Sequence, residues 1–491
     1  MVKSVASEAK LIARHSVIYG LSNVLDRMVG FLMLPVYTRF LTPSDYGIME
    51  LIYMTTSIIS LVVGLGVEAA VGRFYFDYAD EGQRKKVIST AIIGYGAMVF
   101  AVILAMIPFA SPMARLVLDS AEYADLFEIA LLTLALGIVL PIVYAYMRVR
   151  QKSFQYMITK VMMTAAGLGM NIYFVVFAKM GVYGILMSNL LAHLIFTVVL
   201  NIFTLKQTGF RVDYKLLKEM LKFGLPLIPS NISAYIVQAS DRYFVKQYGN
   251  ISMTGLYAMG YKFGTLVNQF VTSPFIQIWS PRRFEYFGKE GYELIYARIF
   301  TYFCILSLFA GLLISLLSKE IIRFMATEPF WAAYKVVPIV TLAYIIFSFH
   351  YHFNVGIMMK KATKYIAYVN VTNGILNLVL NFILIKKYTI WGAAVATLLC
   401  FIFKSSMTYY YSNRLYKIRM EWRRIVMLFA TAFALFFAAF FIETGSIWVN
   451  LLCKGAIGLS FPLVLYFARF FTDEEIKRIK HIIKTRKLEF E

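Results

Sequence analysis

Apolar residues recur along the whole chain in stretches of about the length that crosses a lipid bilayer, and polar residues fill the short segments between them. A helix needs about 20 apolar residues to span the hydrocarbon core. We therefore predict an all-α polytopic membrane protein with fourteen transmembrane helices. The predicted spans cover residues 15–38, 46–71, 88–110, 126–147, 156–178, 182–205, 222–245, 252–279, 295–317, 335–358, 365–385, 390–412, 425–443 and 447–468.

Composition supports this fold class, because 60% of the 491 residues are apolar and only 15% are charged. The net charge of +22 could indicate a nucleic-acid partner. The basic residues, however, follow the predicted loops. With the N-terminus inside, the inner segments hold 34 Lys and Arg residues and the outer segments hold 9. The positive-inside rule then predicts that both termini are cytoplasmic, and no nucleic-acid partner is expected.

Two halves of the chain share one pattern. Asp26 and Arg27 in the first span return as Asp241 and Arg242 in the seventh, both at an offset of 215. Each half holds six spans, so both have the same orientation, and such repeats place a substrate site between them. We predict an N-lobe at 1–205, a cytoplasmic basic linker helix at 206–222, a C-lobe at 223–413, and two extra spans with a basic tail at 414–491.

The repeat extends to later spans at slightly smaller offsets. Gly184 and Gly392 open spans 6 and 12 at an offset of 208. The polar residues of span 5 also match three asparagines of span 11 at an offset of 210. These pairs are Lys160 with Asn370, Gly167 with Asn377, and Asn171 with Asn381.

Six basic residues lie inside predicted spans. A charge at the bilayer centre costs on the order of 2.5 to 3.5 kcal/mol, so such residues usually face a partner or a water-filled cavity. Lys454 lies close to the outer end of its span, and we expect it to snorkel to the interface. The other five are the predicted lining of a cationic cavity: Arg27, Arg242, Lys262, Lys160 and Lys404.

Further polar residues are predicted to support this cavity or to carry a coupling ion: Asp26, Asp241, Asn23, Gln238, Asn231, Glu50 and Glu68. Two alternatives stay open. The Asp-Arg pairs could be structural ion pairs between helices, and Glu50 and Glu68 could simply lie at the membrane interface. No metal site is expected, because His350 and His352 are two residues apart and so point to different sides of a helix.

Enzyme motifs do not occur in the sequence. There is no GxxxxGK[ST] phosphate loop, no HExxH and no GxSxG. A membrane-embedded glycan polymerase would need a sizeable outer loop with catalytic residues, and the predicted outer loops are short. We therefore expect a transporter and not an enzyme.

Three blocks resemble the multidrug/oligosaccharidyl-lipid/polysaccharide exporter superfamily, and in particular its polysaccharide-transport branch of Wzx-like flippases. They are LPVYTRFLTPSDYGIMEL at 34–51, LKFGLPLIPSNISAYIVQASDRYFV at 221–245, and KYIAYVNVTNGILNLVLNFILI at 364–385. The resemblance covers the chain through Leu415. It implies a two-lobed, V-shaped, MATE-like transporter with two extra C-terminal helices.

The resemblance also implies a function. Such a flippase moves an undecaprenyl-pyrophosphate-linked oligosaccharide across the bacterial inner membrane by alternating access, for surface polysaccharides such as O-antigen. It would act as a monomer without a cofactor, driven by H⁺, Na⁺ or the membrane potential, and alongside a polysaccharide polymerase. O-antigen members are described with twelve spans, so a lipid II flippase stays open. An ion-coupled exporter of cationic drugs is the other alternative, although the excess of basic residues in the spans favours an anionic substrate.

Overall fold

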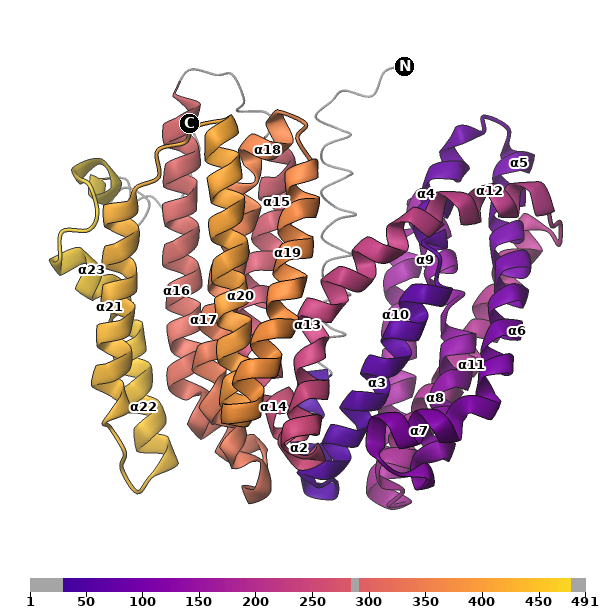
Figure 1. Cartoon of the computed structure of the whole chain (residues 1–491), viewed down its shortest axis with the longest axis horizontal. Helices are drawn as coiled ribbons and strands as arrows, with labels where there is room; N and C mark the ends of the chain where they lie inside the picture. Colours follow the sequence, from indigo (N-terminus) through magenta and orange to yellow (C-terminus); the bar gives the residue numbers. More distant parts are fainter. Residues whose placement is uncertain (1–29, 284–290, 478–491) are drawn as a thin grey trace. The chain divides into compact units, whose positions relative to one another are not determined.

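A computed structural model of the chain describes residues 30–283 and 291–477, in which helices follow one another with short connections and no β-strand occurs (Figure 1). The helices before residue 250 are α2 Leu34–Phe40, α3 Pro43–Val63, α4 Val67–Asp77, α5 Glu81–Ser89, α6 Gly96–Met106, α7 Ala110–Leu118, α8 Ala124–Gly137, α9 Leu140–Val149, α10 Ser153–Ile172, α11 Gly181–Thr208, α12 Tyr214–Gly224 and α13 Ile228–Tyr248. The later helices are α14 Ile251–Gly264, α15 Ser273–Arg282, α16 Tyr292–Met325, α17 Val337–Phe353, α18 Val355–Met359, α19 Lys364–Leu380, α20 Lys386–Leu415, α21 Trp422–Phe440, α22 Ile447–Leu459 and α23 Phe461–Phe467.

Ten helical stretches of the described residues are long and apolar enough to cross a membrane, so the chain is a multi-pass membrane protein. One of them, Lys364–Leu415, is interrupted at Thr389 and covers two predicted spans. Helices α13, α14 and α15 lie where spans 7 and 8 were predicted, and most of span 1 lies outside the described residues. The helical fold class is confirmed, and the count of fourteen is consistent with these helices.

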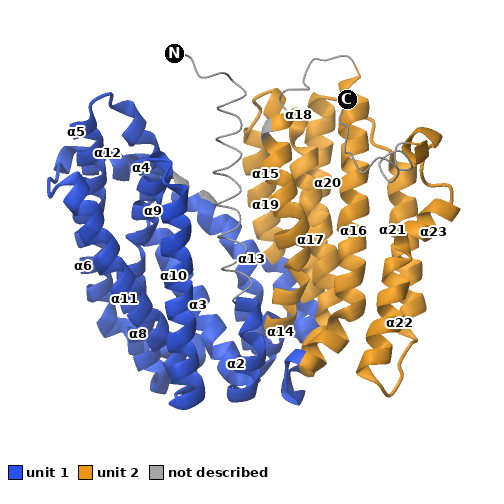
Figure 2. Cartoon of the chain, turned by 180° about the vertical axis from the view of Figure 1, so that it is seen from behind, with its two compact units in different colours: residues 1–258, 325–330, 378–393 blue, residues 259–324, 331–377, 394–491 orange. Residues whose placement is uncertain are grey.

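The chain forms two compact units, shown in two colours in Figure 2. Unit 1 holds residues 1–258, 325–330 and 378–393, and unit 2 holds residues 259–324, 331–377 and 394–491. These units are defined by contacts and not by the internal repeat. The predicted limits of the two lobes therefore stay a prediction.

The repeat appears in the backbone as two short π-helical turns. One, η4, covers Tyr173–Phe177 after α10, and the other, η8, covers Asn381–Ile385 after α19. The two turns are separated by the same offset as Gly184 and Gly392 in the sequence. A Cβ on Gly184 would lie 3.0 Å from the Phe174 Cβ, and one on Gly392 would lie 2.1 Å from the Leu384 carbonyl oxygen. In each repeat, therefore, the next helix packs closely on the π turn.

The turn between these helices repeats as well. Gly181 has φ +55°, and Thr389, at the equivalent position of the second repeat, has φ +48°. Another positive-φ pair precedes the helices, at Gln151 and Lys361, and has the offset that relates span 5 to span 11. Glycine adopts positive φ readily, whereas a β-branched residue does so only under strain. The second repeat thus has the same positive φ at Thr389 as the first repeat has at Gly181, but with a threonine in place of the glycine.

Helix α12 covers the second half of the predicted linker, extends two residues beyond it, and is amphipathic. Leu216, Leu217 and Met220 on its apolar face join the core that α4, α9 and α11 build in unit 1. Its first turn is capped by Asp213, which accepts hydrogen bonds from the backbone N–H groups of Lys215 and Leu216. The apolar face of the linker helix is therefore covered by protein, and its lysines remain at the surface.

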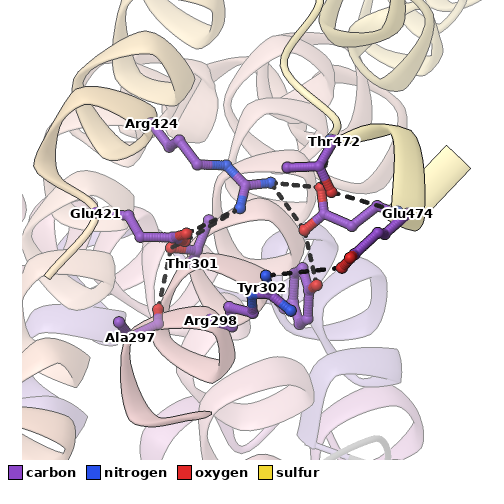
Figure 3. A network of polar contacts seen from close by, with 9 residues as sticks. Ala297, Arg298, Thr301, Tyr302, Glu421, Arg424, Thr472 and Glu474 are labelled. Atoms are coloured by element: carbon purple, nitrogen blue, oxygen red, sulfur yellow. Dashed lines mark hydrogen bonds and ion pairs between the residues drawn. The ribbon is translucent and has the colours of Figure 1, made fainter. Parts of the chain in front are cut away.

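In unit 2 a polar network joins the start of α21 to α16 and to the segment after α23 (Figure 3). The Arg424 guanidinium donates to Glu421 at 3.1 Å and to Glu475 at 2.8 Å. Tyr302 on α16 donates to Glu475 at 2.7 Å, and Thr301 donates to Glu421 at 2.6 Å. The C-terminal segment is thus held against the membrane helices by charged contacts.

Candidate substrate-binding site

Asp241 and Arg242 on α13 lie in the interior of unit 1, with exposed fractions of only 1% and 7%. An Arg242 Nη atom lies 3.1 Å from an Asp241 carboxylate oxygen, and it also donates to the Gln238 carbonyl at 3.0 Å. The Tyr257 hydroxyl donates to the other Asp241 oxygen at 2.6 Å. Both oxygens of Asp241 are therefore bound, and this carboxylate is fixed in place.

Glu50 on α3 is the second partner of Arg242. Its carboxylate lies 3.0 Å from the Arg242 Nε atom, and its side chain is a quarter exposed. Glu50 is one of the predicted supporting residues, but its pairing with Arg242 could not be predicted, since no local pattern connects α3 with α13. The Arg242 charge is therefore balanced by two carboxylates, of which Glu50 is the more accessible.

This arrangement can exchange anions. A guanidinium is planar and binds carboxylates and phosphates through the same parallel N–H groups. Asp241 is held by Tyr257 as well as by Arg242, whereas no other polar partner holds Glu50 among the contacts of the described chain. An incoming phosphate would therefore replace Glu50 more readily than Asp241.

Lys160 on α10 lines a separate cavity of about 480 Å³ that lies wholly within unit 1. Thr164 and Asn171 lie on the same face of α10 and line it too. The polar stripe predicted for span 5 therefore faces a cavity. The remaining walls come from α2, α8, α9 and α11.

A second cavity of about 410 Å³ adjoins the first, and four residues line both: Gly137, Pro141, Asn189 and His193. The Asn189 amide donates to the Tyr53 hydroxyl at 2.8 Å, and the His193 Nδ1 atom lies 2.8 Å from the Asn189 carbonyl. Sequence analysis missed Asn189 and did not assign His193 to a site. The position of Asn189 within an apolar span was the one available signal.

Lys262 and Lys404 belong to unit 2. Lys262 is half-buried on α14, and its carbonyl accepts a hydrogen bond from Thr265 at 2.8 Å. The Lys404 ammonium lies 4.9 Å from the centre of the Phe347 ring, a cation–π contact. The part of Lys262 and Lys404 in a substrate site stays a prediction.

The other predicted residues are spread more widely. Gln238 and Asn231 have exposed side chains on α13. Glu68 pairs with Arg148 at 2.5 Å, with both side chains well exposed, so this carboxylate lies in a surface ion pair. Asn23, Asp26 and Arg27 lie outside the described residues.

The expectation that Lys454 snorkels is wrong. The Lys454 ammonium donates to Glu320 at 2.7 Å, and the exposed fractions of the two residues are 5% and 1%. Glu320 on α16 lies far from Lys454 in the sequence, so local patterning could not identify the pair. Among the residues described by the structure, no group of His, Cys, Asp and Glu is arranged to hold a metal ion.

The fold is that of a polytopic membrane protein with charged residues buried in its interior. A family profile described as polysaccharide biosynthesis protein matches residues 36–283, and the chain belongs to this family. The resemblance to the polysaccharide-transport branch is thus confirmed, and the chain is a transporter-family protein and not an enzyme.

Two named relatives are distant. The chain is 22% identical over 462 residues to the probable low-salt glycan biosynthesis flippase Agl15 of Haloferax volcanii, covering 93% of this chain and 94% of that protein. It is 24% identical over 261 residues to a protein of the Lsg locus of Haemophilus influenzae, covering 52% of this chain and 62% of that relative. The first match extends over nearly the whole length of both proteins.

Solved structures show the same fold. The lipid II flippase MurJ, in an inward closed conformation, has a TM-score of 0.73 to this chain and covers 93% of it, with 15% sequence identity. A multidrug resistance MATE family transporter of the MOP superfamily, inward-facing, has a TM-score of 0.62, covers 79% of this chain and is 13% identical. The predicted MATE-like architecture is thus the fold of the chain.

Proposed function

We propose that the protein is a flippase that moves a lipid-linked oligosaccharide, carried on undecaprenyl pyrophosphate, from the inner to the outer leaflet of the bacterial cytoplasmic membrane. The family of polysaccharide biosynthesis proteins and the name of the relative Agl15 support a flippase of glycan biosynthesis. The glycan and its diphosphate cannot cross hydrocarbon unaided, whereas the polyprenyl tail can stay in the lipid. Both termini would lie in the cytoplasm.

The observation that carries this proposal is the Arg242 cluster. A buried guanidinium with one fixed and one replaceable carboxylate can bind a diphosphate when Glu50 leaves. Lys160, Lys262 and Lys404 add positive charge on other helices, and Arg27 is proposed to join them. A cationic drug would be repelled by these groups. For this reason an ion-coupled drug exporter is the weaker proposal, and a glycan polymerase weaker still.

Native mass spectrometry of the purified full-length protein tests the proposal. A polyprenyl-pyrophosphate glycan is expected to copurify, and the Arg242→Lys variant is expected to retain less of it, because lysine lacks the bidentate fork. Finding only small cations bound to the wild-type protein would sink the proposal.

A lipid II flippase is the second proposal, favoured by the TM-score of 0.73 to MurJ. The same spectra separate the two, because lipid II carries a peptide on its sugars.

The proposed energy source is a coupling ion, H⁺ or Na⁺, or the membrane potential. Transport measured in proteoliposomes, with one gradient imposed at a time, tests which of these drives it. A polysaccharide polymerase is the proposed partner in the pathway, and a monomer is the proposed transport unit.

A further inference from the structure

The turn from α11 into α12 carries basic and aromatic side chains at the surface of unit 1. We call the segment from Lys206 to Lys215 the α11–α12 corner. Lys206, Arg211 and Lys215 are all exposed. Phe210 and Tyr214 lie among them in the sequence and are 71% and 80% exposed. Exposed aromatic rings next to lysine and arginine are typical of the boundary between lipid and water.

The α11–α12 corner continues a surface that faces lipid. Helix α11 belongs to a stretch that is long and apolar enough to cross a membrane. One stripe of this helix exposes apolar side chains, each between 49 and 57% exposed: Ile195, Val199, Ile202 and Phe203. Lys206 follows Ile202 by one helical turn and lies on the same stripe. The ammonium of Lys206 is therefore placed where the hydrocarbon ends and the lipid head groups begin.

The backbone of the corner is held in place by α5 and by the residue after it, Thr90. The Ser89 hydroxyl donates to the Arg211 carbonyl at 2.6 Å, and the Asp213 backbone N–H donates to the Thr90 hydroxyl at 3.0 Å. The Lys86 ammonium lies 2.7 Å from an Asp213 carboxylate oxygen. The exposed side chains are thus carried by a fixed backbone, which lowers the entropic cost of binding a partner.

Positive charge exceeds negative charge at the corner. Asp213 is the one acidic residue between Lys206 and Lys215 in the sequence, and its carboxylate pairs with Lys86 and caps α12. Lys152 adds a further cation, because its ammonium donates to the Gln207 side chain at 3.4 Å. A partner of this surface should therefore be anionic.

An anionic phospholipid matches both the charge and the place of the corner. Its phosphate can meet Lys206, Lys215 and the guanidinium of Arg211, which binds phosphates through two parallel N–H groups. Its acyl chains can lie along the apolar stripe of α11. An acidic protein would match the charge but would approach from water, away from that stripe. We propose that the α11–α12 corner binds the head group of an anionic phospholipid, at a site that does not depend on the proposed flippase function.

Photocrosslinking of the full-length protein in nanodiscs tests the site. The nanodiscs consist of phosphatidylethanolamine with a small, sub-saturating fraction of phosphatidylglycerol that carries a photoactivatable group at its head. After pepsin digestion, the peptide that contains the corner should be labelled. Each basic residue near an anionic surface strengthens binding roughly fivefold, so the double variant Arg211→Gln, Lys215→Gln should lose roughly 25-fold in labelling. Arg115→Gln with Lys335→Gln removes two exposed cations elsewhere and should be labelled as wild type.

Competition identifies what binds. Unlabelled phosphatidylglycerol should abolish the labelling of the corner, whereas inorganic phosphate should leave it unchanged, because a free phosphate has no chains to lie along α11. Equal labelling of wild type and the Arg211→Gln, Lys215→Gln variant would overturn the inference, as would an unlabelled corner in the folded wild-type protein. Displacement by soluble polyglutamate but not by phosphatidylglycerol would show a docking surface for an acidic protein, and the inference would then be wrong.

Discussion

The Nε atom of Arg242 on α13 lies 3.0 Å from a Glu50 carboxylate oxygen on α3, so this charged cluster of unit 1 joins residues from two helices. Asp241 completes the cluster and is itself held by Tyr257. Asp241 is thus held by two residues, whereas Arg242 is the polar partner of Glu50 among the residues that the structure describes. The difference makes Glu50 the residue to test first.

Replacing Glu50 by glutamine should increase the affinity for inorganic pyrophosphate several-fold. Removing the Glu50 charge takes away one of the two carboxylates that the described residues place at Arg242, and a diphosphate no longer has to displace it. Isothermal titration calorimetry of the two proteins measures the difference. Glu68→Gln, which neutralises the carboxylate of the exposed pair with Arg148, is the matched control and should bind as wild type. An equal or weaker affinity in Glu50→Gln would rule out this exchange.

Arg242→Ala should destabilise the protein by about 3 to 5 kcal/mol, because removing one member of a buried ion pair strands the others. Asp241 and Glu50 would both lose their cation. Arg242→Lys keeps the charge and should cost much less. Thermal melting of the purified variants gives the comparison. Equal melting temperatures for wild type and Arg242→Ala would show that this cluster does not stabilise the fold.

Lys454→Met should lower the free energy of unfolding by about 3 to 5 kcal/mol, since it leaves the Glu320 carboxylate buried without its cation. Glu320→Leu should do the same to Lys454. The double variant should recover most of the loss, because two apolar side chains then pack where the ion pair lay. Melting temperatures of the single and double variants complete the cycle, and additive losses would disprove direct pairing.

Thr389→Gly should stabilise the protein by about 1 kcal/mol. Thr389 has φ +48°, which costs a β-branched residue about 1 to 3 kcal/mol, whereas glycine adopts it freely at some cost in unfolded-chain entropy. Gly181→Thr introduces the same strain in the other repeat and should lower the melting temperature. The two variants should therefore change the melting temperature in opposite directions. A lower melting temperature for Thr389→Gly would show that Thr389 is not strained.

Acid should release the C-terminal segment. Burial tends to raise the pKa of Glu475, but the Thr472 amide, Tyr302 and Arg424 together outweigh it and lower this pKa below its usual 4.5. Since the folded-state pKa is lowered, the stabilisation is present above pH 4.5 and is lost as the pH falls through the folded-state value. The protection of the backbone amides of residues 472–477 against hydrogen exchange, relative to the unfolded rate at the same pH, should therefore fall at low pH.

Glu475→Gln should produce the same loss of protection at neutral pH. Glu474→Gln serves as its control, because Glu474 is well exposed and lies 3.9 Å from Arg298, a much weaker contact. Protection that persists at low pH in the wild-type protein would show that apolar packing, and not Glu475, holds this segment.

Much of the fold could be predicted from the sequence, because long apolar runs admit only one structure in a bilayer. The offset between Gly184 and Gly392, visible in the sequence, also separates the two π turns and the positive-φ residues Gly181 and Thr389. The π turns themselves could not be predicted, since a π bulge leaves no simple periodic pattern in an apolar helix.

The candidate site was only partly predictable. The adjacent Asp241 and Arg242 are visible in the sequence, and the stripe from Lys160 to Asn171 does face a cavity. Glu50 and Glu320 were missed as partners of Arg242 and Lys454, because each pair joins helices that are far apart in the sequence. Snorkelling was expected for Lys454 because the sequence does not show that this part of its helix packs against Glu320 on α16.

The two π turns have one more consequence. Each inserts a residue into the helical ladder and so rotates the following side chains by about 100° relative to a regular helix. The polar stripe of α10 ends at YFVVF, and that of α19 ends at NFILI, which is apolar after its first residue. Large side chains of both turns lie at the surface: Tyr173 and Phe177 are 59% and 73% exposed, and Phe382 and Ile383 are 52% and 55% exposed. Each polar stripe therefore ends where its π turn begins, and beyond that point the helix presents mainly apolar side chains to its surroundings.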